Sequence, residues 1–160
     1  MIDGARLDFA INSKVFTKLK NQSTFFSQSI TYAPHTIAAM HAVFSGSYGS
    51  RTGTNSYWST FQFKKNKFKT LTEYLKDFNY YTHADVVNRL VIPKQGFDKH
   101  IIHDEENDVL LERHIGLIHE MNVLAKKQEN FLLYLHYSNI HTGIMNEVLK
   151  VYDNFNKDFF

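Results

Sequence analysis

The spacing of apolar and polar positions changes along the chain, and each change marks a predicted element. Residues 9–22, FAINSKVFTKLKNQ, have apolar side chains at helical spacing, which predicts a helix. A second apolar segment, TIAAMHAVF, begins at Thr36 and predicts a helix closed by Ser45 and Gly46. Residues 46–60 are rich in Gly, Ser and Thr and predict a loop.

Two later helices are predicted from capping residues and from apolar spacing. In TLTEYLKDF, Thr70 is a candidate N-cap and Glu73 follows three residues later, as in a capping box. Residues 109–128, VLLERHIGLIHEMNVLAKKQ, predict a long helix. The apolar stripe of this helix is expected at Leu111, Ile115, Ile118, Met121 or Asn122, and Ala125.

Strand-like segments alternate with these helices. MID at the start resembles the end of a strand, and residues 24–32, TFFSQSITY, are a second candidate. Residues 80–87, YYTHADVV, and residues 130–138, NFLLYLHYS, predict further strands, the last one covered on both faces. Residues 88–108 predict a loop. The alternation predicts an α/β fold, with a mainly parallel sheet and helices on both faces.

Composition and charge narrow the class of protein. The 160 residues are 43% hydrophobic and 21% charged, as in ordinary globular domains, and fit one domain. The net charge of +2 is too small to indicate a nucleic-acid partner. The chain has one local basic run, formed by Lys64, Lys65, Lys67 and Lys69. We interpret this run as a solvated loop or exposed strand, with nucleic-acid binding through neighbouring phenylalanines as a minor alternative.

Cysteine content and hydropathy exclude several kinds of site. No cysteine is present, which excludes disulfides, a thiolate nucleophile and cysteine-based zinc sites. No apolar run approaches the about 20 residues of a membrane helix, and the start lacks the layout of a signal peptide. The cellular compartment stays open, with the cytoplasm as the default.

Asp3 and Thr36 are the first candidates for chemistry. Asp3 follows the first strand segment, where its carboxylate could bind a divalent metal, or it simply forms a turn before Gly4. Thr36 opens a helix, whose free N–H groups and positive dipole end favour a phosphate or sulfate oxygen. Its hydroxyl is either a nucleophile activated by a metal or an N-cap without chemistry.

The nine histidines raise the question of a zinc site. The best candidates are His100 and His103, which lie near the acidic segment DEE at residues 104–106. His114 and His119 are five residues apart and do not share a helix face as an i,i+4 pair does. A dedicated histidine zinc site is therefore the less favoured interpretation.

Several segments together resemble the N-terminal part of sulfatase-like proteins of the alkaline phosphatase superfamily. IDGARLDF resembles the first-strand segment with a metal-binding Asp, and FFSQSITYAPHTIAAMHAVFSGSYGSRTG resembles the segment with the nucleophile and an Ala-rich helix. TLTEYLKDFNYYTHADVV, GFDKHI and NFLLYLHYSNIHTG resemble later segments of the family, the last one delivering a substrate-facing His. All occur in the family's order.

The resemblance implies roles for individual residues. Asp3 corresponds to a metal ligand, Thr36 to the nucleophile and a further metal ligand, and His141 to the substrate-contacting His. Arg51 corresponds to the Arg of a Ser-Arg segment, at the periphery of the substrate site or structural. The implied cofactor is a divalent ion (Mn²⁺, Zn²⁺, Mg²⁺ or Ca²⁺). The implied partner is a small-molecule, lipid or glycan ester of sulfate or phosphate.

The sequence also departs from the family pattern. Formylglycine sulfatases have Cys or Ser where this chain has Thr36, so the resemblance is to the branch with Thr nucleophiles, which includes phosphoethanolamine and phosphoglycerol transferases. Ile140 replaces the Pro before His141, and no Asp-His-Gly segment occurs before Phe160. We therefore expect residues 1–160 to form a single sulfatase-like domain that is an incomplete N-terminal portion, lacking a C-terminal portion.

Two functions are left open by these residues. The first is the N-terminal part of a metal-dependent hydrolase or transferase that acts on sulfate or phosphate esters through Thr36. The alternative is a non-catalytic anion-binding or degenerate sulfatase-like domain that lacks the downstream metal ligands. Whether the chain alone is an active enzyme is not decided by its sequence.

Overall fold

The computed structural model describes residues 1–141, and its chain divides into two compact units. One unit contains Met1–Ile30 and the residues from Tyr137 on, and the other is Thr31–His136. The expectation of a single domain stays a prediction.

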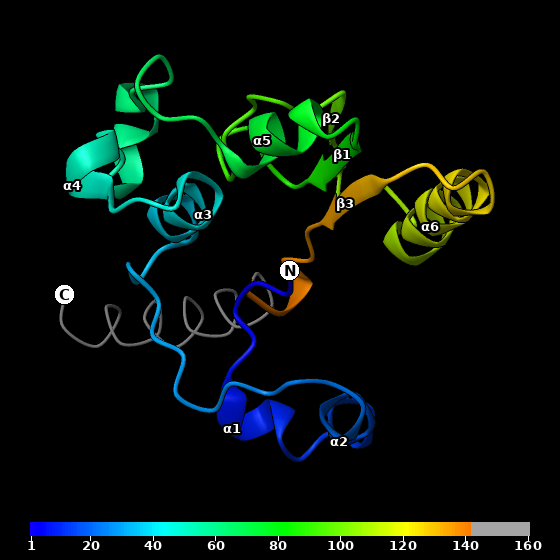
Figure 1. Cartoon of the computed structure of the whole chain (residues 1–160). Coiled ribbons are helices and arrows are strands. Elements are labelled where there is room, and N and C mark those ends of the chain that lie inside the picture. The colour runs from blue at the N-terminus through cyan, green and yellow to red at the C-terminus, as the bar shows by residue number, and fades with distance from the viewer. Residues whose placement is uncertain (142–160) are drawn as a thin grey trace, which may run out of the picture. The chain divides into compact units, whose positions relative to one another are not determined.

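The unit Thr31–His136 is built on a three-stranded parallel sheet (Figure 1). The strands are β1 (Tyr81–Val86), β2 (Lys99–Ile102) and β3 (Phe131–Leu135), in the order β2-β1-β3. Parallel neighbours need crossover connections, and the connection from β1 to β3 contains a long helix. The structure thus confirms a mixed α/β fold with parallel strands.

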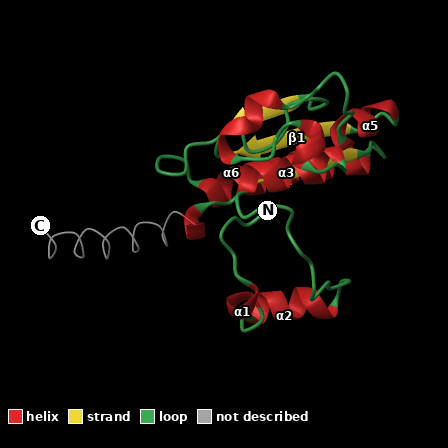
Figure 2. Ribbon diagram, turned by 90° about the vertical axis from the view of Figure 1, so that its left-hand side faces the viewer, coloured by secondary structure: helices red, strands yellow, loops and turns green. Residues whose placement is uncertain are grey.

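Helices surround this sheet (Figure 2). They are α3 (Thr36–Ser45), α4 (Gly49–Thr52), the 3₁₀ helix η1 (Tyr57–Gln62), α5 (Leu71–Asp77) and α6 (Leu110–Lys126). α3 ends at Gly46 with φ +61°, as its sequence predicts. α5 begins with the predicted capping box, in which the Thr70 N–H donates to Glu73 Oε2 at 2.8 Å. The predicted loop 46–60 was wrong in part, since α4 and the start of η1 lie in it.

Alternate residues of β1 face two different layers. Ala84 and Val86 pack in a hydrophobic core with Phe44 of α3. Asp85, between them, contacts His114 of α6 instead. The strands consequently lie between α3 and α6, as Figure 1 shows, and helices cover both faces of the central strand.

One predicted strand is absent from the structure, and one predicted loop contains a strand. Residues 24–32 form turns and irregular chain and are exposed throughout, including Phe26 at 75% and Ile30 at 95%. A strand needs a partner for its backbone hydrogen bonds, and this segment has none in the described chain. Conversely, β2 lies in the predicted loop 88–108, where only four residues pair with β1.

β3 and α6 form where they were predicted, but the burial of their side chains differs from the prediction. All of β3 is half-buried, because it is an edge of the described sheet. On α6 the predicted stripe is largely exposed, at Leu111 65%, Ile115 45% and Ile118 47%. The buried side chains are Leu110, His114 and Met121, of which only Met121 belongs to the predicted stripe. The face toward the sheet thus includes a histidine, which an apolar pattern does not reveal.

The other unit is made of short elements. The predicted helix 9–22 is divided into α1 (Leu7–Ala10) and α2 (Lys14–Asn21) by extended backbone at Ser13, with φ −80° and ψ 128°. The predicted opening strand is reduced to one parallel bridge between Ile2 and Tyr137.

Candidate functional site

The residues assigned by the family resemblance belong to both units. Asp3 and His141 lie in the unit that begins at Met1, and Thr36 and Arg51 lie in the sheet-containing unit. A common site for all four residues therefore stays a prediction.

The segments of Asp3 and His141 lie side by side in their unit. The Asp3 N–H donates to the Tyr137 carbonyl at 2.7 Å. Gly4 has φ +74°, and a Cβ added there would lie 2.9 Å from His141 Cα. A side chain at Gly4 would thus collide with the backbone of His141. Asp3 and Gly4 also form a turn, so the turn interpretation of Asp3 is compatible with the structure.

Thr36 is the first residue of α3 and not its N-cap, so the capping prediction was wrong by one position. The N-cap is His35, in extended backbone with φ −126° and ψ 148°, and its Nδ1 accepts the Ala38 N–H at 3.5 Å. Thr36 is half-buried within the first helical turn. Its hydroxyl remains near the positive end of the helix dipole.

Arg51 lies in α4 and is exposed. Its carbonyl accepts a hydrogen bond from Lys64 Nζ at 3.0 Å, which ties α4 to the basic run. The run itself is an exposed turn after η1, as the solvated-loop interpretation expected. A substrate contact by Arg51 stays a prediction.

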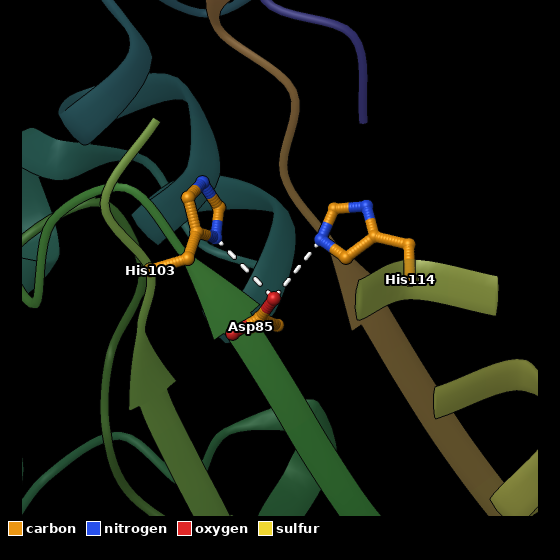
Figure 3. A group of neighbouring side chains, drawn as sticks. All are labelled: Asp85, His103 and His114. Carbon is orange, nitrogen blue, oxygen red and sulfur yellow. Dashed lines mark hydrogen bonds and ion pairs between the residues drawn. The ribbon is translucent and has the colours of Figure 1, made fainter. Parts of the chain in front are cut away.

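A second group of ionisable side chains is buried beside β1, and it includes only His103 among the residues that the sequence indicated. Asp85, His103 and His114 are only 0%, 3% and 1% exposed. His114 Nε2 lies 2.9 Å from Asp85 Oδ2, and His103 Nδ1 lies 3.3 Å from the same oxygen. Figure 3 shows the two imidazoles on either side of the carboxylate, both directed at it.

Sheet register and helix packing explain why these three side chains meet. Asp85 pairs with Ile101 of β2, and His103 is two residues further on, on the same side of the sheet. The His103 N–H donates to the Val86 carbonyl at 3.0 Å, which holds the chain beyond β2 against β1. α6 then presents His114 from the helix layer on that side.

Arg113 completes the surroundings of the buried carboxylate. Its Nε donates to Asp85 Oδ2 and its NH2 donates to Oδ1, both at 2.8 Å, in a bidentate pair. On the far side of His103, Nε2 lies 3.6 Å from Glu105 Oε1. One buried carboxylate therefore faces a guanidinium and two imidazoles.

These contacts set the charge state of the group. Burial alone would raise the pKa of Asp85, but hydrogen bonds and charge from Arg113 outweigh it and hold that pKa below its ordinary value. Burial lowers the pKa of His114, and the nearby Asp85 carboxylate only partly opposes this. Near neutral pH, Asp85 is an anion and His114 a neutral imidazole, the forms in which both side chains bind metal ions.

The sequence-based prediction included His103 but discounted His114 and did not consider Asp85. His114 was compared with a histidine on its own helix, whereas its partner is a strand residue 29 positions earlier. A signal was present in YTHADV, because an Asp inside an otherwise strand-like segment must find a partner if the strand is buried.

No protein-family model matches the chain, and neither the curated proteins nor the solved structures include a significant match. The sulfatase-like resemblance thus stays a prediction made from the sequence. Among residues 1–141, no helix combines the length and the apolar character that crossing a membrane requires.

Proposed function

We propose that this chain is the N-terminal part of a sulfatase-like hydrolase or transferase that acts on sulfate or phosphate esters, with Thr36 as the nucleophile. Three features support this proposal: the order of the motifs along the sequence, the parallel α/β architecture, and a helix that begins at Thr36.

The observation that carries the proposal is the parallel bridge between Ile2 and Tyr137. It brings together the segment of the proposed metal-binding Asp3 and the segment of the proposed substrate-binding His141. These segments are far apart in the sequence, and their close contact at residue 4 requires a glycine. Gly4 at that contact has both a positive φ and no room for a side chain.

The position of Thr36 suits attack on an anionic centre. The positive end of the α3 dipole lies at Thr36 and favours negative charge there. The same dipole stabilises the charge that grows on a phosphoryl or sulfuryl group when the Thr36 hydroxyl approaches.

In the proposed step, Thr36 Oγ1 forms a bond to phosphorus or sulfur as the bond to the leaving oxygen breaks. The hydroxyl proton of Thr36 passes to water, and His141 gives a proton to the leaving oxygen. Water then releases the group in a hydrolase, or an acceptor hydroxyl takes it in a transferase. Arg51 is proposed at the periphery of the substrate.

The residues that the resemblance assigns to the divalent ion do not by themselves complete a site. Asp3 and Thr36 offer one carboxylate and one hydroxyl, whereas zinc takes about four ligands and calcium about six to eight.

The proposal is tested by rates on a phosphodiester and a sulfate ester, with Mn²⁺ or Zn²⁺ added to the full chain. We expect turnover by the parent and by Thr36→Ser, which keeps a hydroxyl, and background rates for Thr36→Ala. Equal rates for the parent and Thr36→Ala would exclude Thr36 as nucleophile. If the parent is inactive but binds inorganic phosphate or sulfate, the non-catalytic alternative is supported instead.

A further inference from the structure

We propose that Asp85, His103 and His114 form a binding site for a divalent transition metal, with Zn²⁺ as the ion that fits best. The proposal is independent of the ester chemistry above, because it uses none of the residues assigned to that reaction. It concerns only the sheet-containing unit, Thr31–His136.

Two of the three spacings between the potential ligands are close to those of a tetrahedral ion. One ligating atom of each side chain lies within 4.8 Å of the others. In a tetrahedron with bonds of about 2.0–2.1 Å, neighbouring ligand atoms are about 3.3 Å apart. The two distances from Asp85 Oδ2, 2.9 Å to His114 and 3.3 Å to His103, are close to that edge.

His103 supplies a second, independent observation. Its side chain is completely buried, yet within residues 1–141 neither ring nitrogen has a hydrogen-bond partner of acceptable geometry. Buried polar nitrogens without such a bond are costly, and a bound ion is one of the explanations for them. Nδ1 is directed at the carboxylate oxygen that His114 also approaches, so both imidazoles are aimed at the same oxygen (Figure 3).

The donor set selects the kind of ion. Two imidazoles and one carboxylate suit Zn²⁺ and its transition-metal neighbours, whereas Mg²⁺ and Ca²⁺ prefer oxygen ligands. Three protein ligands leave a fourth position for water or another oxygen donor.

The surrounding charges resemble the outer partners of a metal site. Arg113 binds both carboxylate oxygens of Asp85 at 2.8 Å and fixes their orientation. Each carboxylate oxygen can accept more than one bond, so Arg113 and an ion can share Oδ2. Glu105, 3.6 Å from His103 Nε2, is placed to orient the imidazole from its far side.

A bound ion would connect three elements of the unit. Asp85 belongs to β1, His103 follows β2, and His114 belongs to α6. Metal binding to the folded state alone stabilises that state by mass action. We therefore expect Zn²⁺ to raise the melting temperature of the chain.

The test is a titration of the full chain with Zn²⁺ and with Co²⁺, whose visible absorption reports tetrahedral coordination. We expect one equivalent to bind with matching NMR shifts of the imidazole nitrogens of His103 and His114. His103→Gln and His114→Gln should each lower the affinity by about 100-fold or more, beyond the about 10–100-fold typical of losing an outer partner. The matched control is His119→Gln, an exposed position of the same helix, which should bind like the parent.

Three results would overturn the site: no binding by the parent, unchanged affinity in both glutamine variants, or nitrogen shifts only at other histidines. The NMR measurement on the parent decides the matter even if a variant does not fold. The nitrogen shifts of His103 and His114 report this site without any ester turnover, so failure of the proposed ester chemistry and failure of this site are separate outcomes.

Discussion

Asp85 is a carboxylate with no exposed surface, and three neighbouring side chains determine its charge. An ionised carboxylate is costly to bury unless it is paired and hydrogen-bonded. Arg113 provides the pairing through two hydrogen bonds, and His114 provides a third. At the scale of single residues, β1 can therefore hold a buried Asp because α6 supplies the side chains that bind its carboxylate.

Removing this charge is expected to destabilise the fold. Asp85→Asn keeps the side-chain shape but leaves Arg113 without its buried partner, and breaking such a pair costs about 3–5 kcal/mol. The side chain of Arg113 is 30% exposed and regains some hydration in the variant. We therefore expect the free energy of unfolding to fall by about 3 kcal/mol.

Urea unfolding at neutral pH measures this loss. The control is Asp108→Asn, because Asp108 is a more exposed partner of Arg113 at 3.7 Å. Asp108→Asn should lower the free energy of unfolding by less than about 1 kcal/mol, as expected for an exposed ion pair. Similar small losses in both variants would contradict the role given to Asp85.

His41 provides a pH-dependent prediction at the same scale. It is 2% exposed on α3, its Nδ1–H donates to the Ile37 carbonyl at 2.8 Å, and burial lowers its pKa below the ordinary 6.5. The folded state favours the neutral ring, while the unfolded chain takes up a proton first as pH falls. The free energy of unfolding should therefore decrease from pH 6.5 downward, until the folded-state pKa is reached.

The measurement is the free energy of unfolding at about pH 7 and about pH 5 for the parent and His41→Gln. Other buried histidines also contribute, so the variant should show a smaller decrease and not a flat profile. An identical decrease in both proteins would show that His41 does not contribute.

At the scale of elements, helix starts and ends were predictable from the sequence where all the residues that form them lie within a few positions of one another. The capping box of Thr70 and Glu73 and the glycine end of α3 were both predicted from the sequence and are present. β2 was missed because its four residues form a strand only beside β1. Residues 24–32 have strand-like composition without a partner, so composition alone misled the prediction.

The candidate metal site was not predictable for a related reason. Its ligands come from three elements, and their convergence depends on sheet register and on the face that α6 presents. The apolar pattern of α6 placed the buried stripe about one position away from His114. That pattern therefore gave no reason to expect His114 on the face that meets Asp85.

Gly96 lies at a close contact between two segments, whereas Gly116 has open space around it. Gly96 has φ +78°, and a Cβ there would lie 2.4 Å from the Glu73 backbone nitrogen at the start of α5. Gly96→Ala should therefore destabilise the unit by more than about 1 kcal/mol. Gly116 lies within α6 with no atom within 4 Å of an added Cβ, so Gly116→Ala should stabilise by about 0.5–1 kcal/mol.

Thermal unfolding of the two alanine variants checks both signs. The substitutions are chemically identical, so they differ only in backbone conformation and in available space. A stabilising Gly96→Ala would contradict the close approach of the residue 96 turn to α5.

At the scale of the whole molecule, the sequence predicts the fold class well and the function only by resemblance. Alternating strands and helices predicted a parallel α/β arrangement, which the parallel pairing of β1 with both β2 and β3 confirms. The proposed enzyme rests on motifs and on the pairing of the Ile2 and Tyr137 segments. The buried Asp85 group is separate from those motifs and provides a distinct hypothesis.

The most direct measurement of the central claim is mass spectrometry of the chain quenched during turnover of a phosphodiester or sulfate ester. The account predicts a covalent phosphoryl or sulfuryl group on the peptide that contains Thr36, and none on that peptide in Thr36→Ala. Turnover without any modified Thr36, or with the group on another residue, would contradict a Thr36 nucleophile.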